Sequence, residues 1–372
     1  MRFAFVCLLL FISLIANCQK YFLFIGTYTG SGSKGIYVYT FDVATGKAQW
    51  VSNTEGVVNP SYLAIAPGNS LLYACTETRT ADAGGISAFR FNRKNGSLTF
   101  INKQSSGGDN PAYVAVHKSG KWVIAGNYSG GNLAVFPVNS DGSLQPYSQL
   151  IQHTGSSVNK RRQESPHVHA TVFSPKGDHL FVPDLGMDKI MIYKFNALQQ
   201  TPLLPATTSY VSVEAGAGPR HFPFHPNKKW AYLIEEMAGA VVTYNYKKGK
   251  LDALQQIPTH PDTANGGFGS ADIHISPDGK FLYASNRGTE NNITIFSINQ
   301  GTGVLTLIGY QSTMGIQPRN FTIDPSGMYL LAANQKSGNI VIFKRDKQTG
   351  LLQYTGEQII IPEPVCLKMI QQ

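Results

Sequence analysis

Short apolar runs separated by turns rich in glycine and proline follow one another along most of this chain. Residues 320–324 alternate between polar and apolar positions, a Pro-Ser-Gly turn follows at 325–327, and residues 329–333 are apolar without interruption. Alternation is typical of a half-buried strand, and a short apolar run bounded by turns is typical of a strand covered on both faces. Residues 340–343 predict a third strand, and the segment opening at 350–352 predicts a polar edge strand. Outside the N-terminal region no amphipathic helix pattern stands out, so an all-β fold is expected.

This four-strand unit recurs. Its central turn reads His-Pro-Asn-Lys at 225–228, Ser-Pro-Asp-Gly at 276–279 and Asp-Pro-Ser-Gly at 324–327. The residues that open each unit, called anchors here, are spaced 46 to 55 positions apart; they are Pro60, Pro111, Pro166, Pro219, Ser270, Pro318 and Pro364. A fixed period of this size, built from short strands, indicates a β-propeller with four strands per blade.

The two ends of the chain decide the number of blades. The last anchor is followed by one strand only, at 365–370, whereas residues 21–28 and 35–39 resemble the second and third strands of other units. Together these fragments complete one blade and leave no exposed sheet edge. We therefore predict a seven-bladed β-propeller with four-stranded blades, closed by the C-terminal strand joining the N-terminal blade, as a single domain over 19–372.

Residues 1–18 have the pattern of an export signal peptide, with Arg2, an apolar run from Phe3 to Ile15, and Ala-Asn-Cys at 16–18. Cleavage after Cys18 leaves Gln19 as the mature N-terminus. Alternatively Cys18 is lipidated, because residues 14–18 resemble a lipobox, although asparagine before the cysteine is atypical. No other segment is apolar enough to span a membrane. An exported protein is expected, periplasmic or extracellular, with a lipid anchor as the alternative.

Two cysteines remain after such cleavage, Cys75 and Cys366, both inside apolar strands. They belong to neighbouring blades, so a disulfide is conceivable, but buried thiols that act as small apolar side chains are the favoured interpretation. The cysteine spacing is not that of a metal site. No metal and no cofactor are expected.

The formal net charge is +9, yet only 14% of the residues are charged. The basic residues are scattered, apart from Lys160-Arg161-Arg162. Nucleic-acid binding requires a continuous basic face, so this class is disfavoured. A local site for a small anion fits better, and a monomer or weak dimer is expected.

The repeat predicts where polar side chains converge. In a propeller blade the innermost strand runs antiparallel to the second strand, so the start of the first and the end of the second meet at one mouth of the central channel. Side chains at these two positions form what we call the funnel. The positions after the anchors are Ser61, Ala112, His167, Arg220, Ala271 and Arg319, and the second strands end at Tyr28, Glu77, Tyr128, Asp184, Glu236, Arg287 and Gln335. Each blade supplies a different polar group, which a binding site requires and a scaffold does not.

Structural alternatives exist for these residues. Arg220 and Arg319 would tie blades together, and Glu236 would pair with Arg220 as a structural ion pair. His167 and His169 share one strand face, which invites a metal, but an obvious third ligand is lacking. An insertion from Gly155 to Glu164 is a candidate lid over the same mouth, or else a solvated loop. Because such a mouth is wet, we expect its ion pairs to add little to folding stability.

Several segments resemble the seven-bladed lactonase family of propeller-type 6-phosphogluconolactonases and carboxymuconate lactonizing enzymes. They read Arg-Gln-Glu-Ser-Pro-His-Val-His at 162–169, Val-Pro-Asp-Leu-Gly at 182–186, Gly-Pro-Arg-His at 218–221, the stretch 276–288, and Pro-Arg-Asn-Phe at 318–321 with Ala-Asn-Gln at 333–335. The resemblance implies a site built from His167, Arg220, Glu236 and Arg287. The family often has Asn-Glu where this chain has Glu235-Glu236, and the repeat phase favours Glu236 as the inward carboxylate.

The expected reaction is metal-independent hydrolysis of a sugar lactone. A neutral histidine or a carboxylate accepts the proton of the attacking water, so His167 or Glu236 is the base. Arg220 and Arg287 are expected to hold the substrate anion and the oxyanion. Further substrate contacts are expected from Arg319, Gln335, His169, Asp184, Tyr128, Glu77 and Arg162. The alternatives are a muconate-type cycloisomerase, using the same groups, and a noncatalytic exported propeller that binds a ligand or protein.

Overall fold

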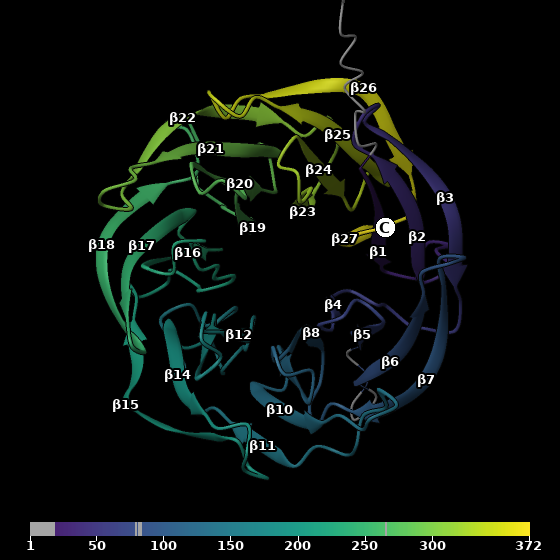
Figure 1. Ribbon diagram of the computed structural model, residues 1–372. Coiled ribbons are helices and arrows are strands. Elements are labelled where there is room, and N and C mark those ends of the chain that lie inside the picture. Colours follow the sequence, from purple (N-terminus) through teal and green to yellow (C-terminus); the bar gives the residue numbers. More distant parts are fainter. Residues whose placement is uncertain (1–18, 79, 81–83, 265) are drawn as a thin grey trace, which may run out of the picture.

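The computed structural model of the protein describes residues 19–78, 80, 84–264 and 266–372, and these residues form strands and no helix. Seven sheets are arranged in a ring around a central channel (Figure 1). The innermost strand of each sheet lines the channel and the last strand lies at the rim. The prediction of an all-β, seven-bladed propeller is confirmed.

In chain order the blades have the following strands. The closing blade contains β1 (Lys20–Thr27), β2 (Ile36–Asp42), β3 (Lys47–Thr54) and β27 (Pro364–Gln371); the next two contain β4 (Leu63–Ile65), β5 (Leu71–Thr76), β6 (Gly85–Asn92) and β7 (Ser97–Ser105), then β8 (Pro111–Val116), β9 (Trp122–Asn127), β10 (Asn132–Pro137) and β11 (Gln149–Gln152). The remaining four contain β12 (Val172–Phe173), β13 (His179–Asp184), β14 (Lys189–Phe195) and β15 (Leu203–Ser212); β16 (Trp230–Glu235), β17 (Ala240–Lys247) and β18 (Lys250–Pro258); β19 (Ser270–Ile275), β20 (Phe281–Asn286), β21 (Asn292–Ile298) and β22 (Leu305–Ser312); and β23 (Pro318–Ile323), β24 (Tyr329–Asn334), β25 (Asn339–Arg345) and β26 (Leu352–Ile360).

The blade of β16–β18 has an irregular innermost strand. Isolated bridges from Pro219 to Glu235 and from Phe224 to Ala231 replace a continuous ladder there. The intervening Pro223 has no backbone N–H to donate to such a ladder. The segment that includes Pro219 and Phe224 therefore occupies the place of the innermost strand but does not form a regular strand.

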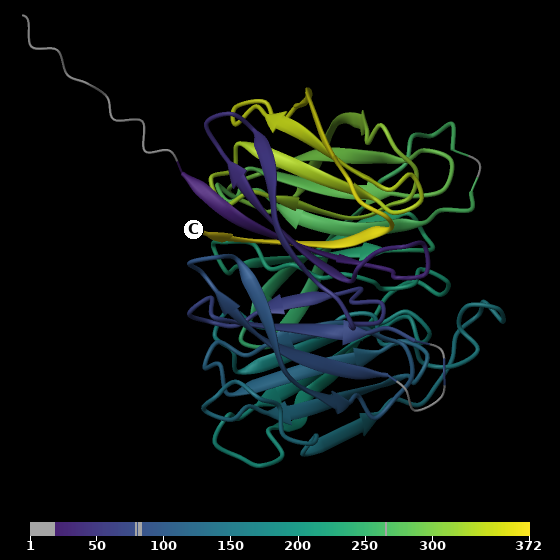
Figure 2. The same cartoon turned by 90° about the vertical axis from the view of Figure 1, so that its right-hand side faces the viewer.

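The ring closes as expected from the two ends of the sequence. Strand β27 pairs antiparallel with β1, from Tyr21 opposite Gln371 to Thr27 opposite Pro364. Figure 2 shows the yellow C-terminal strand lying along the purple β1. The first and last strands of the propeller thus share one sheet, and β1 is paired on both of its edges.

The central turns and the strands that follow them explain the repeat. Gly279 and Gly327 have φ of 71° and 70°, and Lys228 takes the same conformation at 65° without a glycine. The second strands β9, β16, β20 and β24 are buried along their whole length, which accounts for their apolar sequences. Cys75 and Cys366 are both free and buried, so the interpretation as buried thiols is confirmed.

A bulge follows the anchor in several blades. Pro318 lies opposite Asn334, but two residues later Asn320 lies opposite Ala333, so Arg319 is left over. A bulge redirects the extra side chain, and Arg319 lines the channel mouth as a result. The same shift follows Pro111.

The anchor of the third repeat differs from the prediction. Val168 is bridged to Asp184, just as Pro111 pairs with Asn127. Val168 therefore holds the anchor position, two residues after Pro166, and His169 rather than His167 holds the position after it. His167 precedes the anchor, at the place that Asn110 occupies in the blade before.

Candidate active site

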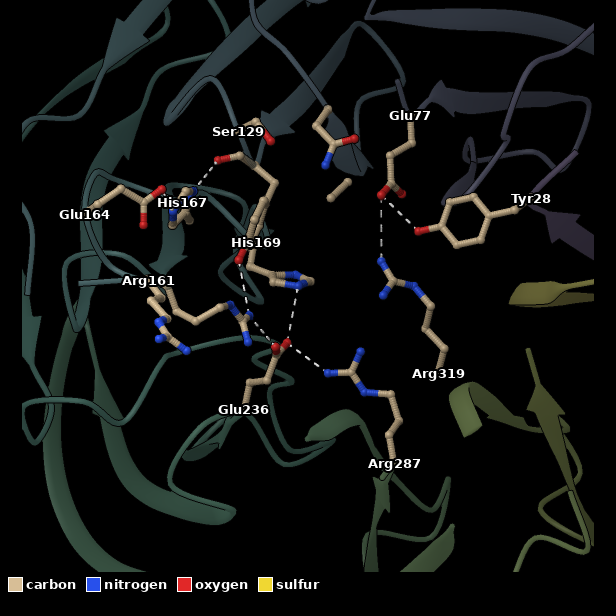
Figure 3. A pocket seen from close by; sticks show the side chains of 14 residues that line it. Tyr28, Glu77, Ser129, Arg161, Glu164, His167, His169, Glu236, Arg287 and Arg319 are labelled. Carbon is tan, nitrogen blue, oxygen red and sulfur yellow. Dashed lines mark hydrogen bonds and ion pairs between the residues drawn. The ribbon is translucent and has the colours of Figure 1, made fainter. Parts of the chain in front are cut away.

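A cavity of about 580 Å³ opens at the mouth of the channel where the funnel was expected. Figure 3 shows charged and aromatic side chains from different blades pointing into it. Its lining residues are Tyr28, Glu77, Asn110, Ala112, Tyr128, Ser129, Arg161, Arg162, Glu164, His167, His169, Glu236, Arg287 and Arg319. Eight of the eleven site residues predicted from the sequence are among them: His167, Glu236, Arg287, Arg319, His169, Tyr128, Glu77 and Arg162.

Glu236 lies at the centre of three guanidinium groups. Its Oε1 is 2.6 Å from Nη2 of Arg162, and its Oε2 is 3.0 Å from both Nε of Arg220 and Nη2 of Arg287. Burial alone would raise the pKa of this carboxyl group, but Arg287, Arg220 and the other cations hold it well below its usual range. Glu236 is therefore a fixed anion that orients arginines, and a carboxylate of such low basicity accepts a proton poorly.

Arg220 lies beneath this carboxylate and does not line the cavity. It is 2% exposed, and Nη1 donates to the backbone oxygen of Ala271. Burial, and then the charge of Arg287, lower the pKa of Arg220 to about 10, although Glu236 opposes this. The expectation that these ion pairs sit in a wet mouth and add little to stability is wrong for Arg220, because a buried arginine without its carboxylate would be strongly destabilising.

Two histidines line the cavity in different surroundings. His167 is stacked on Tyr128, with ring centroids 4.5 Å apart. Its Nδ1 donates to the Tyr128 carbonyl oxygen at 3.0 Å, and its Nε2 lies 3.3 Å from Oε1 of Glu164. Burial, followed by the charge of Arg220, lowers the pKa of His169 well below its usual range, so this imidazole is neutral. Its Nε2 is 3.8 Å from Oε2 of Glu236.

A second carboxylate and arginine, Glu77 and Arg319, lie together on another side of the cavity. Glu77 accepts a hydrogen bond of 2.9 Å from the hydroxyl of Tyr28, and Nη2 of Arg319 lies 3.9 Å from the same oxygen. The Arg319 guanidinium also lies over the Tyr28 ring. Figure 3 shows this group facing the one around Glu236.

The insertion from Gly155 to Glu164 contributes Arg161, Arg162 and Glu164 to the cavity wall. Its fixed point is Gln163, which is fully buried and donates to Asp188 at 2.7 Å and to the Leu185 carbonyl oxygen at 2.9 Å. The lid interpretation thus agrees with the position of this loop, which the buried glutamine holds in place.

Asp184 and Gln335 are not brought into the cavity. Asp184 is fully buried, and its Oδ1 accepts from the backbone N–H groups of His167 at 2.7 Å and Gly186 at 3.0 Å. The prediction that Asp184 contacts substrate is wrong, because the shifted anchor places it at the end of β13, inside the blade. Gln335 lies beside Glu363, at 3.4 Å, outside the cavity lining.

Some lining residues were not in the predicted site. Tyr28 ends a second strand and was in phase with the funnel, so a signal for it existed. Asn110 precedes an anchor, and the recurring Asn-Pro at 59–60 and 110–111 is a weak signal for that position. Arg161, Glu164 and Ser129 lie in loops that do not follow the repeat, and their inward position could not be inferred from it.

Glu235 points away from the cavity and lies in a separate pocket. It is fully buried, one oxygen accepts from Gln256 at 2.8 Å, and the other has no partner. Burial, with small contributions from Glu214 and Asp188, raises the pKa of Glu235 to about 7. In two other blades this strand-end position holds an amide, Asn127 or Asn286, which donates to a loop carbonyl.

Glu235→Gln is therefore expected to stabilise the protein at pH 8. A carboxyl group whose pKa is higher in the folded state favours folding below its unfolded value of 4.5, and this contribution is lost as the pH rises through about 7. The variant should be about 3 kcal/mol more stable than wild type at pH 8 and nearly equal near pH 4.5. Denaturant unfolding at both pH values measures this difference. Glu214→Gln, at an exposed position in the same pocket, is the control and should change little; an equal stability of wild type and Glu235→Gln at pH 8 would contradict the raised pKa.

Comparison with known proteins identifies similar propellers that are named as lactonases. The sequence profile described as "Lactonase, 7-bladed beta-propeller" matches residues 22–369. A protein of Formosa agariphila named 6-phosphogluconolactonase is 41% identical over 349 residues, covering 93% of this chain and 99% of that protein, and its Bacillus subtilis namesake is 36% identical, covering 95% and 99%. A solved structure of a periplasmic gluconolactonase from Pseudomonas aeruginosa has a TM-score of 0.90 and 35% identity, covering 94% of this chain and 99% of that one.

The fold and the cavity are thus those of a lactone-processing β-propeller. The chain belongs to the seven-bladed β-propeller lactonase family, which confirms the resemblance seen in the sequence and the expected class of enzyme, a carboxylic ester hydrolase. Among the described residues, no helix is long and apolar enough to cross a membrane. Residues 1–18, with the predicted signal peptide and Cys18, lie outside the described residues.

Proposed function

We propose that the protein hydrolyses an aldonolactone, the cyclic ester of a sugar acid, with His167 as the base. The observation that carries this proposal is the tethering of His167 at the cavity wall: Nδ1 is engaged by a backbone carbonyl oxygen, so the proton of a water molecule would go to Nε2, beside Glu164. Relatives named 6-phosphogluconolactonase and gluconolactonase support a sugar lactone as the substrate.

The proposed reaction begins with proton transfer from water to Nε2 of His167, while the water oxygen attacks the lactone carbonyl carbon. Glu164, 3.3 Å from this nitrogen, stabilises the imidazolium that forms. The carbonyl oxygen becomes an oxyanion, which receives hydrogen bonds from guanidinium N–H groups of Arg287 and Arg162 that Glu236 does not occupy. Collapse of this intermediate breaks the ring C–O bond, and the departing alkoxide takes the proton back from His167.

Glu236 and Arg220 act in this scheme by positioning. Glu236 holds Arg162 and Arg287 side by side, and buried Arg220 supports Glu236 from below. Of the two bases that the sequence allowed, we favour His167, because three guanidinium groups suppress the basicity of Glu236. In this scheme the reaction uses no metal, which stays a prediction, as does export to the periplasm or the extracellular space.

His167→Gln is expected to lower kcat by about 10²- to 10⁴-fold, the usual contribution of a general base. Steady-state kinetics on glucono-δ-lactone measure this effect. His169→Gln, which removes the other cavity histidine, should lower kcat far less; if instead His169→Gln has the larger effect and His167→Gln leaves kcat unchanged, the base has been misassigned.

A further inference from the structure

Arg161 differs from the other arginines that line the cavity because it forms no ion pair with a described carboxylate. Arg162 and Arg287 contact Glu236, and Arg319 lies near Glu77. The ion pairs formed among the described residues include none with Arg161. Its side chain is exposed, at the rim, and Figure 3 shows it beside the inward-facing groups.

The backbone around Arg161 is held firmly, although its side chain is exposed. Its N–H donates to the side chain of Asn159 at 3.1 Å, and the N–H of Gln163 donates to the Asn159 carbonyl oxygen at 2.7 Å. On one side of it Arg162 is fixed to Glu236, and two residues later Gln163 is buried. A charged group on an anchored loop is already in place for a ligand, so less ordering entropy opposes binding.

We propose that Arg161 recognises a phosphate monoester on the lactone, and that it gives the enzyme a preference for phosphorylated over plain aldonolactones. This inference rests on the proposed lactone hydrolysis. A guanidinium group forms paired hydrogen bonds with phosphate oxygens, and an arginine without a carboxylate partner gives up no ion pair to do so. The other cavity arginines already have a carboxylate, Glu236 or Glu77, near their guanidinium groups.

The shape of the substrate agrees with this assignment. In a six-membered aldonolactone the phosphate is carried on an exocyclic methylene group, on the ring carbon next to the ring oxygen. With the carbonyl carbon beside His167, this substituent lies at the other end of the ring C–O bond, within the same cavity that Arg161 lines. Arg161 is therefore a specificity-determining residue and takes no part in the bond-breaking steps.

Arg161→Ala should raise KM for 6-phosphoglucono-δ-lactone about tenfold or more and leave its kcat nearly unchanged, because the contact is equally present in the ground state and the transition state. Both parameters for glucono-δ-lactone should stay at the wild-type values. The wild-type preference for the phosphorylated lactone should also shrink as salt is added, since a rim charge is screened. Arg161→Lys, which keeps the charge, should lose less than Arg161→Ala.

Lys160→Ala is the matched control, since Lys160 is exposed, adjacent in sequence and outside the cavity lining. It should behave as wild type on both lactones. Equal losses of Arg161→Ala on the two lactones, or no loss on either, would overturn the assignment of Arg161 while leaving the lactonase proposal intact. Wild-type protein that hydrolyses neither lactone would overturn the proposed function itself and this inference with it.

Discussion

Glu236→Gln is expected to lower kcat/KM for a sugar lactone by about a hundredfold or more. The glutamine side chain has nearly the same shape but no charge, so the guanidinium groups of Arg162, Arg220 and Arg287 repel one another without compensation. Oxyanion donors displaced by about 1 Å are enough to cost on the order of 10²-fold in rate. Steady-state kinetics on a plain and a phosphorylated lactone, at a temperature where the variant is folded, measures the effect.

The same substitution should also destabilise the protein, by about 3–5 kcal/mol, because it leaves buried arginines unpaired. Glu236→Asp separates this effect from the kinetic one. Aspartate keeps the charge and should recover most of the stability, but its carboxylate is one methylene shorter and should not restore the rate. Normal turnover by Glu236→Gln, combined with early unfolding, would reduce Glu236 to a structural tie between blades.

The repeat made the fold predictable because each blade forms the same strands and turns from similar residues. A proline or serine opens the inner strand, a Pro-Asp-Gly type turn follows, and an apolar run forms the covered second strand. Ring closure could be predicted as well, since residues 21–28 and 364–370 were each an incomplete blade. The anchor of the blade that contains β12–β15 was misplaced, because Pro166 resembles an anchor and lies two residues before the true one, Val168.

The sequence could predict which side chains lie near the channel mouth, but not which of them are buried beneath the others. Repeat phase places a side chain at the mouth of the channel, and Glu236, Arg287 and Arg319 lie there. It does not show which group is underneath another, and Arg220 is buried below Glu236 instead of facing the substrate. That order depends on the strand bulges and on contacts between blades, which leave no trace in the spacing of residues. The loop that carries Arg161 does not follow the repeat and required the structure.

The charged residues on the floor of the cavity and those at its entrance, here called the rim of the cavity, have different roles. On the floor, one carboxylate fixes three arginines, and this order is costly to disturb because Glu236, Arg220 and Arg287 are buried. At the rim, Arg161 is wet and unpaired, so its replacement should alter substrate choice without affecting folding. Substitutions at these two cavity residues should therefore differ in their effects. A change at Glu236 should lower the rate and the stability, whereas a change at Arg161 should raise KM for the phosphorylated lactone.

Removing residues 364–372 is expected to prevent stable folding. These residues supply β27, the innermost strand of the closing blade, and its ladder to β1 runs from Tyr21 to Thr27. The deletion removes apolar side chains that are buried in the ring, among them Val365 and Leu367, and the burial of each contributes about 1.5–3 kcal/mol. Together with the unpaired backbone groups of β1, this loss approaches the total stability of about 5–15 kcal/mol typical of a domain.

Far-ultraviolet circular dichroism and thermal unfolding of the truncated protein measure this loss. The control removes only Gln371 and Gln372, which are exposed, and should melt close to the full chain. A peptide of residues 362–372 added to the truncated chain should restore cooperative unfolding, because β27 meets β1 only through a ladder and side-chain packing that a separate strand can form again. An unchanged melting temperature after the long deletion would mean that β27 does not close the ring, and the stability of the propeller would then come from contacts between the other blades alone.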